Sequence, residues 1–294
     1  MINWIWKYRE FITAYDKSNS ENDWFQSYVN SYLMPNIDLL NGIYFRQRGF
    51  ATRADILGRM DALGGKKYFE KLRTNIGDLE KFEESVKSCT QSILSNFKVQ
   101  PGDLDFYIII GLDVTNIYST AYQGENVTVL CLEAANGDIS NLRLLLSHEC
   151  HHWLRGTFFE GKLFGNCVGE RVVTEGLAIN FSESLFPGNQ VCDYCYVPEA
   201  TVNWVTDHWN AIDKVICEEV YKNDNASGFF TRHKTSGLLP DEPPRIGYVY
   251  GYLKVKEYLE KVKSNPIDLV GLSWEKVFFR PSAHPEPWRV EDNF

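Results

Sequence analysis

Three residues that can bind and use a metal ion, His148, Glu149 and His152, form the pattern H-E-x-x-H. The surrounding residues, 141–154, are predicted to form a helix, so the two imidazoles project from one helix face, where both can bind a single zinc ion. Glu149 is then positioned to act on a water held by that ion. A five-residue pattern is short, so its interpretation as a metal site needs support from the rest of the chain.

A carboxylate that can complete this metal site follows on the next predicted helix. A catalytic zinc site needs three protein ligands and one open position for water. In the run Thr174-Glu175-Gly176-Leu177-Ala178, Glu175 lies 23 residues beyond the second histidine, an interval that suits a helix, a reversing turn and a second packed helix. Glu170 offers a carboxylate one turn earlier, whereas the metzincin extension is absent, because Arg155 and Phe158 stand where Gly and His are needed. The two histidines and Glu175 are therefore the predicted zinc ligands.

Patterns of apolar residues predict the other helices and the strands. Residues 1–100 are predicted to be helical, most clearly where an apolar stripe at steps of three and four follows Asp78, a plausible N-cap. Two runs rich in β-branched and aromatic residues, 105–111 and 126–133, predict strands. Further helices are predicted over 168–184, 199–222 and 246–263, with a long loop over 223–245.

These elements predict an α+β fold that is mainly helical, with a small sheet contributed by residues 105–133. The expected domains are a helical N-terminal region over 1–100 and a catalytic domain over 101–294. The strand over 126–133 comes just before the H-E-x-x-H helix. We expect it to lie at the sheet edge, where an extended peptide can add as a further strand.

Composition and charge exclude several classes of protein. At 294 residues and 44% hydrophobic, the chain is long enough for a well-buried core. The net charge is −9 and no dense block of Lys and Arg occurs, so a surface for nucleic acid or for an anionic membrane is not expected. We find neither a signal-peptide core nor a long apolar run, and the 7 cysteines have no repeat spacing, so a cytoplasmic protein with reduced thiols is expected. The oligomeric state is left open.

Two further motifs carry a resemblance to a known family. Glu175-Gly-Leu-Ala178 after H-E-x-x-H resembles the E-x-x-A signature of gluzincins, the zinc peptidases whose third ligand is Glu. With Gly-Tyr-Val-Tyr-Gly-Tyr-Leu-Lys-Val at 247–255, these motifs resemble a bacterial family of predicted zinc-dependent proteases over residues 105–263. The resemblance implies a zincin-like fold, a zinc cofactor and a peptide or protein substrate. Thr174 and Ile179 stand where other branches carry Asn and Asp, and no G-x-M-x-N exopeptidase motif is present, so an aminopeptidase is not implied.

The chemistry that such a site implies is hydrolysis of a peptide bond. Zinc lowers the pKa of its water to about 7 and polarises the scissile carbonyl, while Glu149 acts as general base and later delivers the proton to the leaving amine. Tyr248 and Tyr252, four residues apart on one helix face, are candidate donors to the oxyanion, and His233 competes with them. A glycine directly before each of these two tyrosines would let the helix backbone approach the site closely.

Simpler interpretations and rival functions stay open at this point. The H-E-x-x-H residues can form a solvated helix face, Glu175 can be a salt-bridge partner, and the tyrosines can serve packing alone. His151 lies off the ligand face. Cys192-x-x-Cys195 can form a second, structural zinc site with His208 and Cys217. The rival functions are a zinc hydrolase acting on a non-peptide bond and a binding module without catalysis, but zinc binding alone would not require the glutamate between the histidines.

Overall fold

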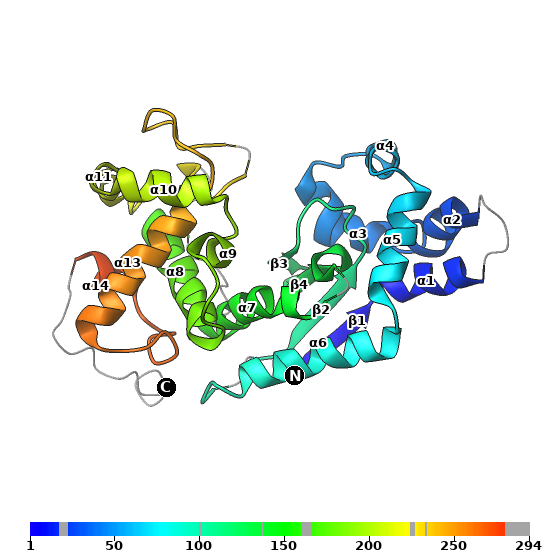
Figure 1. Cartoon of the computed structure of the whole chain (residues 1–294), viewed down its shortest axis with the longest axis horizontal. Coiled ribbons are helices and arrows are strands. Elements are labelled where there is room, and N and C mark those ends of the chain that lie inside the picture. The colour runs from blue at the N-terminus through cyan, green and yellow to red at the C-terminus, as the bar shows by residue number, and fades with distance from the viewer. Residues whose placement is uncertain are drawn as a thin grey trace. The chain divides into compact units, whose positions relative to one another are not determined.

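Helices make up most of the structure, and one four-stranded sheet accompanies them (Figure 1). The computed structural model describes residues 1–17, 23–99, 102–136, 138–159, 166–223, 227–232 and 234–279. The strands are β1 (Ile2–Trp6), β2 (Leu104–Ile109), β3 (Ile117–Tyr122) and β4 (Glu125–Cys131). The α-helices are α1 (Tyr8–Asp16), α2 (Asp23–Gln26), α3 (Ile37–Leu40), α4 (Arg53–Ala62), α5 (Lys66–Ile76), α6 (Leu79–Leu94), α7 (Ser140–Phe158), α8 (Val168–Leu185), α9 (Val191–Cys195), α10 (Glu199–Asp207), α11 (Trp209–Glu219), α13 (Ile246–Val262) and α14 (Trp274–Phe278). The predicted α+β class is confirmed.

The chain packs as two compact units. The first consists of Met1–Gln91 and Pro101–Leu145, and the second of Ser92–Gln100 and Leu146–Phe294. The first unit holds all four strands, including β1, which lies in a region that was predicted to be helical. The division into 1–100 and 101–294 remains a prediction.

The sheet of the first unit has the strand order β1-β2-β4-β3. Pairing is parallel between β1 and β2 and between β2 and β4, and antiparallel between β4 and β3. The central strands β2 and β4 are buried along most of their length, which agrees with the apolar runs that predicted them. Gln123 and Gly124, with φ of 53° and 88°, form the two-residue turn between β3 and β4, a geometry that suits a tight hairpin.

The expectation that residues 126–133 form a sheet edge was wrong. β4 is hydrogen-bonded on both sides, to β2 and to β3, so its backbone cannot accept an added peptide strand. The sequence pattern predicted no strand over residues 117–122. They form β3, whose burial alternates only weakly, and this strand covers the side of β4 that was expected to be free.

The second unit is built around α8. Every residue from Val172 to Ser182 is buried, and α8 contacts α9, α11, α13 and α14. α7 is equally buried over residues 145–156, and the Ser147 hydroxyl donates to the Ser182 hydroxyl at 2.8 Å, which joins the two helices. Their predicted ranges, 141–154 and 168–184, are confirmed, as is the helix over 246–263, which is α13. None of the helices in the described ranges is long and apolar enough to cross a membrane.

The predicted single helix over 199–222 is instead two helices, α10 and α11, separated at His208. The φ and ψ of His208 are −107° and 15°, outside the helical range. The carbonyl of Trp204 accepts from the His208 backbone N–H at 3.1 Å and lies 2.8 Å from ring nitrogen Nδ1, while the two rings stack with centroids 4.4 Å apart. The imidazole thus takes part in ending α10, an effect that apolar periodicity does not detect.

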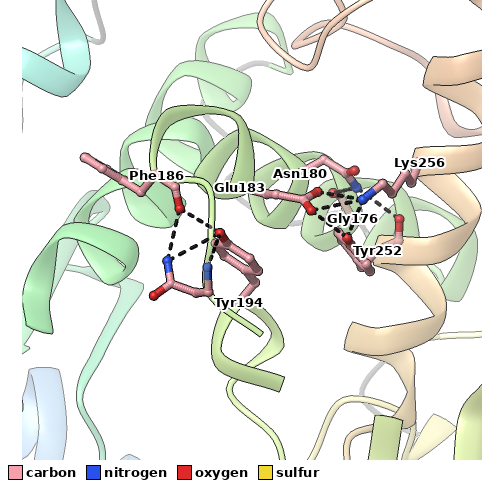
Figure 2. A network of polar contacts seen from close by, with 8 residues as sticks. Gly176, Asn180, Glu183, Phe186, Tyr194, Tyr252 and Lys256 are labelled. Atoms are coloured by element: carbon pink, nitrogen blue, oxygen red, sulfur yellow. Dashed lines mark hydrogen bonds and ion pairs between the residues drawn. The ribbon is translucent and has the colours of Figure 1, made fainter. Parts of the chain in front are cut away.

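A backbone-to-backbone contact between two glycines sets the distance between α8 and α13. A Cβ added at Gly176 would lie 2.3 Å from the carbonyl oxygen of Gly251, and one added at Gly251 would lie 2.7 Å from the carbonyl oxygen of Val172. Beside this contact the Asn180 side chain donates to the carbonyls of Gly176 and Tyr252, at 2.8 and 3.0 Å (Figure 2). The two helices can approach so closely only because neither position carries a side chain.

Replacing Gly176 with alanine is therefore expected to lower the free energy of unfolding by about 3 kcal/mol, because the new methyl group meets main-chain atoms that cannot rotate away. Urea denaturation checks this value. Gly58→Ala is the matched control, since Gly58 lies inside α4 with open space around it, and this change should raise stability by roughly 0.5–1 kcal/mol. Equal effects of the two substitutions would contradict the packing argument.

Candidate metal centre

The H-E-x-x-H residues lie in the buried middle of α7. His148 and His152 are one helical turn apart, with ring centroids separated by 4.5 Å, and their Nε2 atoms face each other at 2.9 Å. Their exposed fractions are 6% and 1%, and that of Glu149 is 5%. This burial excludes the interpretation of the motif as a solvated helix face, because three polar side chains are almost wholly shielded from solvent.

Glu175 on α8 meets the two histidines. Its Oε2 lies 2.9 Å from Nε2 of His148 and 3.4 Å from Nε2 of His152. A tetrahedral zinc ion with ligand bonds of about 2.0–2.1 Å requires its ligand atoms to be about 3.3 Å apart, close to the three separations seen here. These side chains form the group that could hold a metal ion within the described ranges. The predicted ligand set is thus brought together by α7 and α8.

The alternative ligand Glu170 has a different role. Its Oε1 accepts from the guanidinium of Arg155 at 2.7 Å. Arg155 is 1% exposed and also donates to the hydroxyl of Thr174 and to the carbonyls of Val270 and Leu272, at 2.7–2.9 Å. Arg155 and Glu170 therefore connect α7 and α8 to the segment before α14, and the carboxylate of Glu170 is occupied there.

Arg171 orients the carboxylate of Glu175. It lies one turn before Glu175 on α8, and its Nη2 is 2.7 Å from Oε1, the oxygen that does not face the histidines. Burial alone would raise the pKa of Glu175, but the charge of Arg171 and the contacts with the two histidines outweigh it and hold this pKa well below its ordinary value. Glu175 is therefore an anion at neutral pH, as a metal ligand must be.

The imidazole of His152 is neutral at the same pH. Burial lowers its pKa, and the neighbouring carboxylate of Glu175 offsets only part of that effect. Burial likewise holds the pKa of His151 well below its ordinary value, and this ring packs against Phe97 and Phe181 instead of facing the group. The structure thus keeps His151 apart from the group, in agreement with its position on the helix.

Replacing Arg171 with methionine is expected to weaken zinc binding by ~10- to 100-fold, the usual effect of losing a residue that orients a ligand. Zinc affinity measured by competition with a chelating dye checks this. Lys254→Met is the matched control, because it breaks another ion pair of the same unit, with Asp213 at 2.7 Å, away from the group. A weakening that is equal in the two variants would indicate general loosening of the unit.

Sequence reasoning did not identify Tyr196, which contacts the candidate metal group. Its ring packs edge-on against His148, with centroids 5.8 Å apart and planes at 82°. Burial raises its pKa well above the ordinary value, and the carboxylate of Glu149 adds to this effect. No local motif marks Tyr196, because the segment after α8 must fold back toward α7 before this residue can contact His148.

The candidate oxyanion donors Tyr248 and Tyr252 contact other residues in the structure. The Tyr252 hydroxyl donates to Glu183 at 3.0 Å and accepts from Lys256 at 2.7 Å, in a network between α8 and α13 (Figure 2). The Tyr248 ring lies under the guanidinium of Arg245 and against Phe230. Neither tyrosine has a described contact with the three ligands, and His233 lies outside the described residues.

The second zinc site considered for Cys192, Cys195, His208 and Cys217 is not formed by the described residues. All 7 cysteines are free thiols. Cys195 is buried and its Sγ faces the carbonyl of Tyr248 at 3.9 Å, while the His208 ring is engaged with Trp204.

Comparison with known proteins agrees with this geometry. A family model described as Predicted Zn-dependent protease (DUF2268) matches residues 112–278, more than half of the chain. The matched range contains the three ligand candidates, Glu149 and Tyr196. No curated protein and no solved structure gave a match.

Proposed function

The chain belongs to the family of predicted Zn-dependent proteases, and on that premise we propose that it is a zinc-dependent peptidase. The observation that carries the proposal is the buried group of His148, His152 and Glu175, whose candidate ligand atoms have separations close to those that a tetrahedral ion requires. Two imidazoles and one carboxylate suit zinc, whereas calcium and magnesium prefer oxygen ligands alone.

In the proposed mechanism these three residues hold zinc, which supplies a Lewis acid that activates water and polarises a peptide carbonyl. Glu149 takes a proton from the attacking water while the water oxygen bonds to the carbonyl carbon. Glu149 then gives that proton to the amide nitrogen as the carbon–nitrogen bond breaks. Its burial favours this role, because a carboxylate shielded from solvent exchanges its proton with the substrate and not with bulk water.

We also propose that the fold is zincin-like and of the gluzincin type. The support is local: the part of α7 that carries the two proposed histidine ligands packs against α8, which supplies the proposed glutamate ligand, and these three residues belong to the second unit. The catalytic domain is proposed to span residues 101–294, with the N-terminal hundred residues as an extension.

The experiment that tests the function measures zinc per chain together with turnover of a peptide library, of esters and of small amides. We expect about one zinc ion per chain and turnover of peptides that stops with a chelator and returns with added zinc. Turnover of esters or small amides alone would favour a zinc hydrolase for a non-peptide bond. Zinc binding without turnover of any substrate would favour the binding module.

A further inference from the structure

The hydroxyl of Tyr196 is a buried hydrogen-bond donor that has no partner among the described residues. Such groups are rare, since an unmet buried donor loses its hydration without compensation. The Tyr28 hydroxyl in the first unit is also buried without a partner among the described residues. In the second unit Tyr194 donates to the carbonyl of Phe186 at 2.6 Å, Tyr250 to Asp213 at 2.6 Å, and Tyr252 to Glu183 at 3.0 Å. Figure 2 shows the first and third of these bonds. Tyr196 thus keeps a donor that the described chain does not use.

The surroundings of Tyr196 are those of the candidate metal centre. Its ring contacts His148, and the carboxylates of Glu149 and Glu175 both lie near enough to act on its hydroxyl electrostatically. His148 has its own buried Nδ1 without a partner within the described ranges, so packing against Tyr196 contributes to the orientation of this imidazole. The hydroxyl is therefore in the same small region as two ligands and the general base.

The backbone of Tyr196 is held in an uncommon conformation. Tyr196 follows the last residue of α9 with φ of 53° and ψ of 43°, the left-handed region that a bulky side chain rarely adopts. Its carbonyl accepts from Nη1 of Arg245 at 2.6 Å, and the Arg245 guanidinium rests on the Tyr248 ring. Strained residues that are held in place by their surroundings are concentrated at functional sites.

We propose that the hydroxyl of Tyr196 donates a hydrogen bond to the carbonyl oxygen of a bound peptide as that oxygen gains negative charge. The role rests on the proposed peptidase function, and it takes the place foreseen for Tyr248 or Tyr252. Tyr196 keeps its proton throughout, while Glu149 carries the proton from water to the leaving amine. Tyr252 is less suited, because its hydroxyl already has two charged partners, Glu183 and Lys256.

The test compares Tyr196→Phe with Tyr194→Phe, a matched loss of a hydroxyl two residues away. Two peptide inhibitors probe the zinc-loaded protein: a phosphinic peptide, whose anionic oxygens imitate the developing oxyanion, and a mercapto peptide, which has no such oxygen. In Tyr196→Phe we expect the phosphinic peptide to bind roughly 10- to 100-fold more weakly, the usual effect of losing a hydrogen bond to a charged group. Affinity for the mercapto peptide should stay within about threefold, and kcat should fall more than KM rises.

Thermal unfolding adds a second, independent readout. Tyr196→Phe removes a buried donor without a partner, so its melting temperature should be no lower than that of the wild type. Tyr194→Phe removes an existing hydrogen bond, so its melting temperature should be lower, while its affinity for both inhibitors should be unchanged.

Three outcomes would overturn the assignment: unchanged affinity of Tyr196→Phe for the phosphinic peptide, an equal loss for both inhibitors, or a selective loss in Tyr248→Phe or Tyr252→Phe instead. A wild-type protein that hydrolyses no peptide would overturn the proposed function itself. In a wild type that does hydrolyse peptides, the first three results refute only the role of Tyr196.

Discussion

Replacing Glu149 with glutamine is expected to lower kcat/KM for peptide hydrolysis by ~10²- to 10⁴-fold, the range in which a general base contributes to catalysis. Glutamine has nearly the same shape and still fits beside Tyr196 and the ligands, but it cannot take a proton from water. Zinc content should not change, because Glu149 is not among the three residues of the metal group. A fluorogenic peptide assay and elemental analysis of the same sample give both numbers.

Glu199→Gln serves as the control for this substitution, since Glu199 is exposed in the first turn of α10 and its charge faces solvent. Full activity of the Glu149 variant would remove the general base from the mechanism and favour the non-catalytic binding module. A loss of zinc along with activity would instead mean that Glu149 supports the metal.

Replacing His148 with alanine is expected to weaken zinc binding by more than ~100-fold, because the loss of a ligand exceeds the 10- to 100-fold effect of losing a residue that orients one. His148 lies within 2.9 Å of the ligand atoms of both His152 and Glu175, so its removal opens one corner of the group. Elemental analysis after dialysis against a weak chelator measures the loss, and hydrolysis should fall with it.

The matched control is His151→Leu on the same helix. His151 is equally buried, but its neighbours are Phe97 and Phe181, so zinc should be retained. Circular dichroism of both variants shows whether the overall helical content is retained. If His148→Ala kept its zinc, another set of ligands would have to be sought, and the proposed site would be lost.

The helices that carry the candidate metal group could be predicted from sequence because their signals are local. H-E-x-x-H sets the spacing of two imidazoles along one helix, and the Glu-Gly-Leu-Ala run marks a second helix at a distance that a turn can bridge. Both helices are almost wholly buried, so they show little amphipathic pattern. Their lengths and ends could nevertheless be predicted from the sequence. The observed Glu175 contacts follow from pairing these two predictions.

What could not be predicted depends on contacts between distant parts of the chain. β1 is a strand because it pairs with β2, about a hundred residues later, and its own five residues do not specify that partner. Tyr196 reaches His148 by way of a left-handed turn and the Arg245 guanidinium, neither of which leaves a motif. Tyr248 and Tyr252 were predicted from their helical spacing, but spacing does not determine which residues of α8 contact the side chains of α13.

The contact between Gly176 and Gly251 has a consequence for how the protein tolerates mutation. When two side chains clash, trimming one of them can relieve the other, but here the nearest opposing atoms are main-chain carbonyl oxygens, which every amino acid possesses. A second substitution on the opposite helix cannot remove these carbonyl oxygens, so a side chain at either glycine can be accommodated only if one whole helix shifts. Since Gly176 directly follows Glu175, that displacement would pull the Glu175 carboxylate away from His148 and His152, and variation at these glycines should be suppressed as strongly as at the three residues of the candidate metal group.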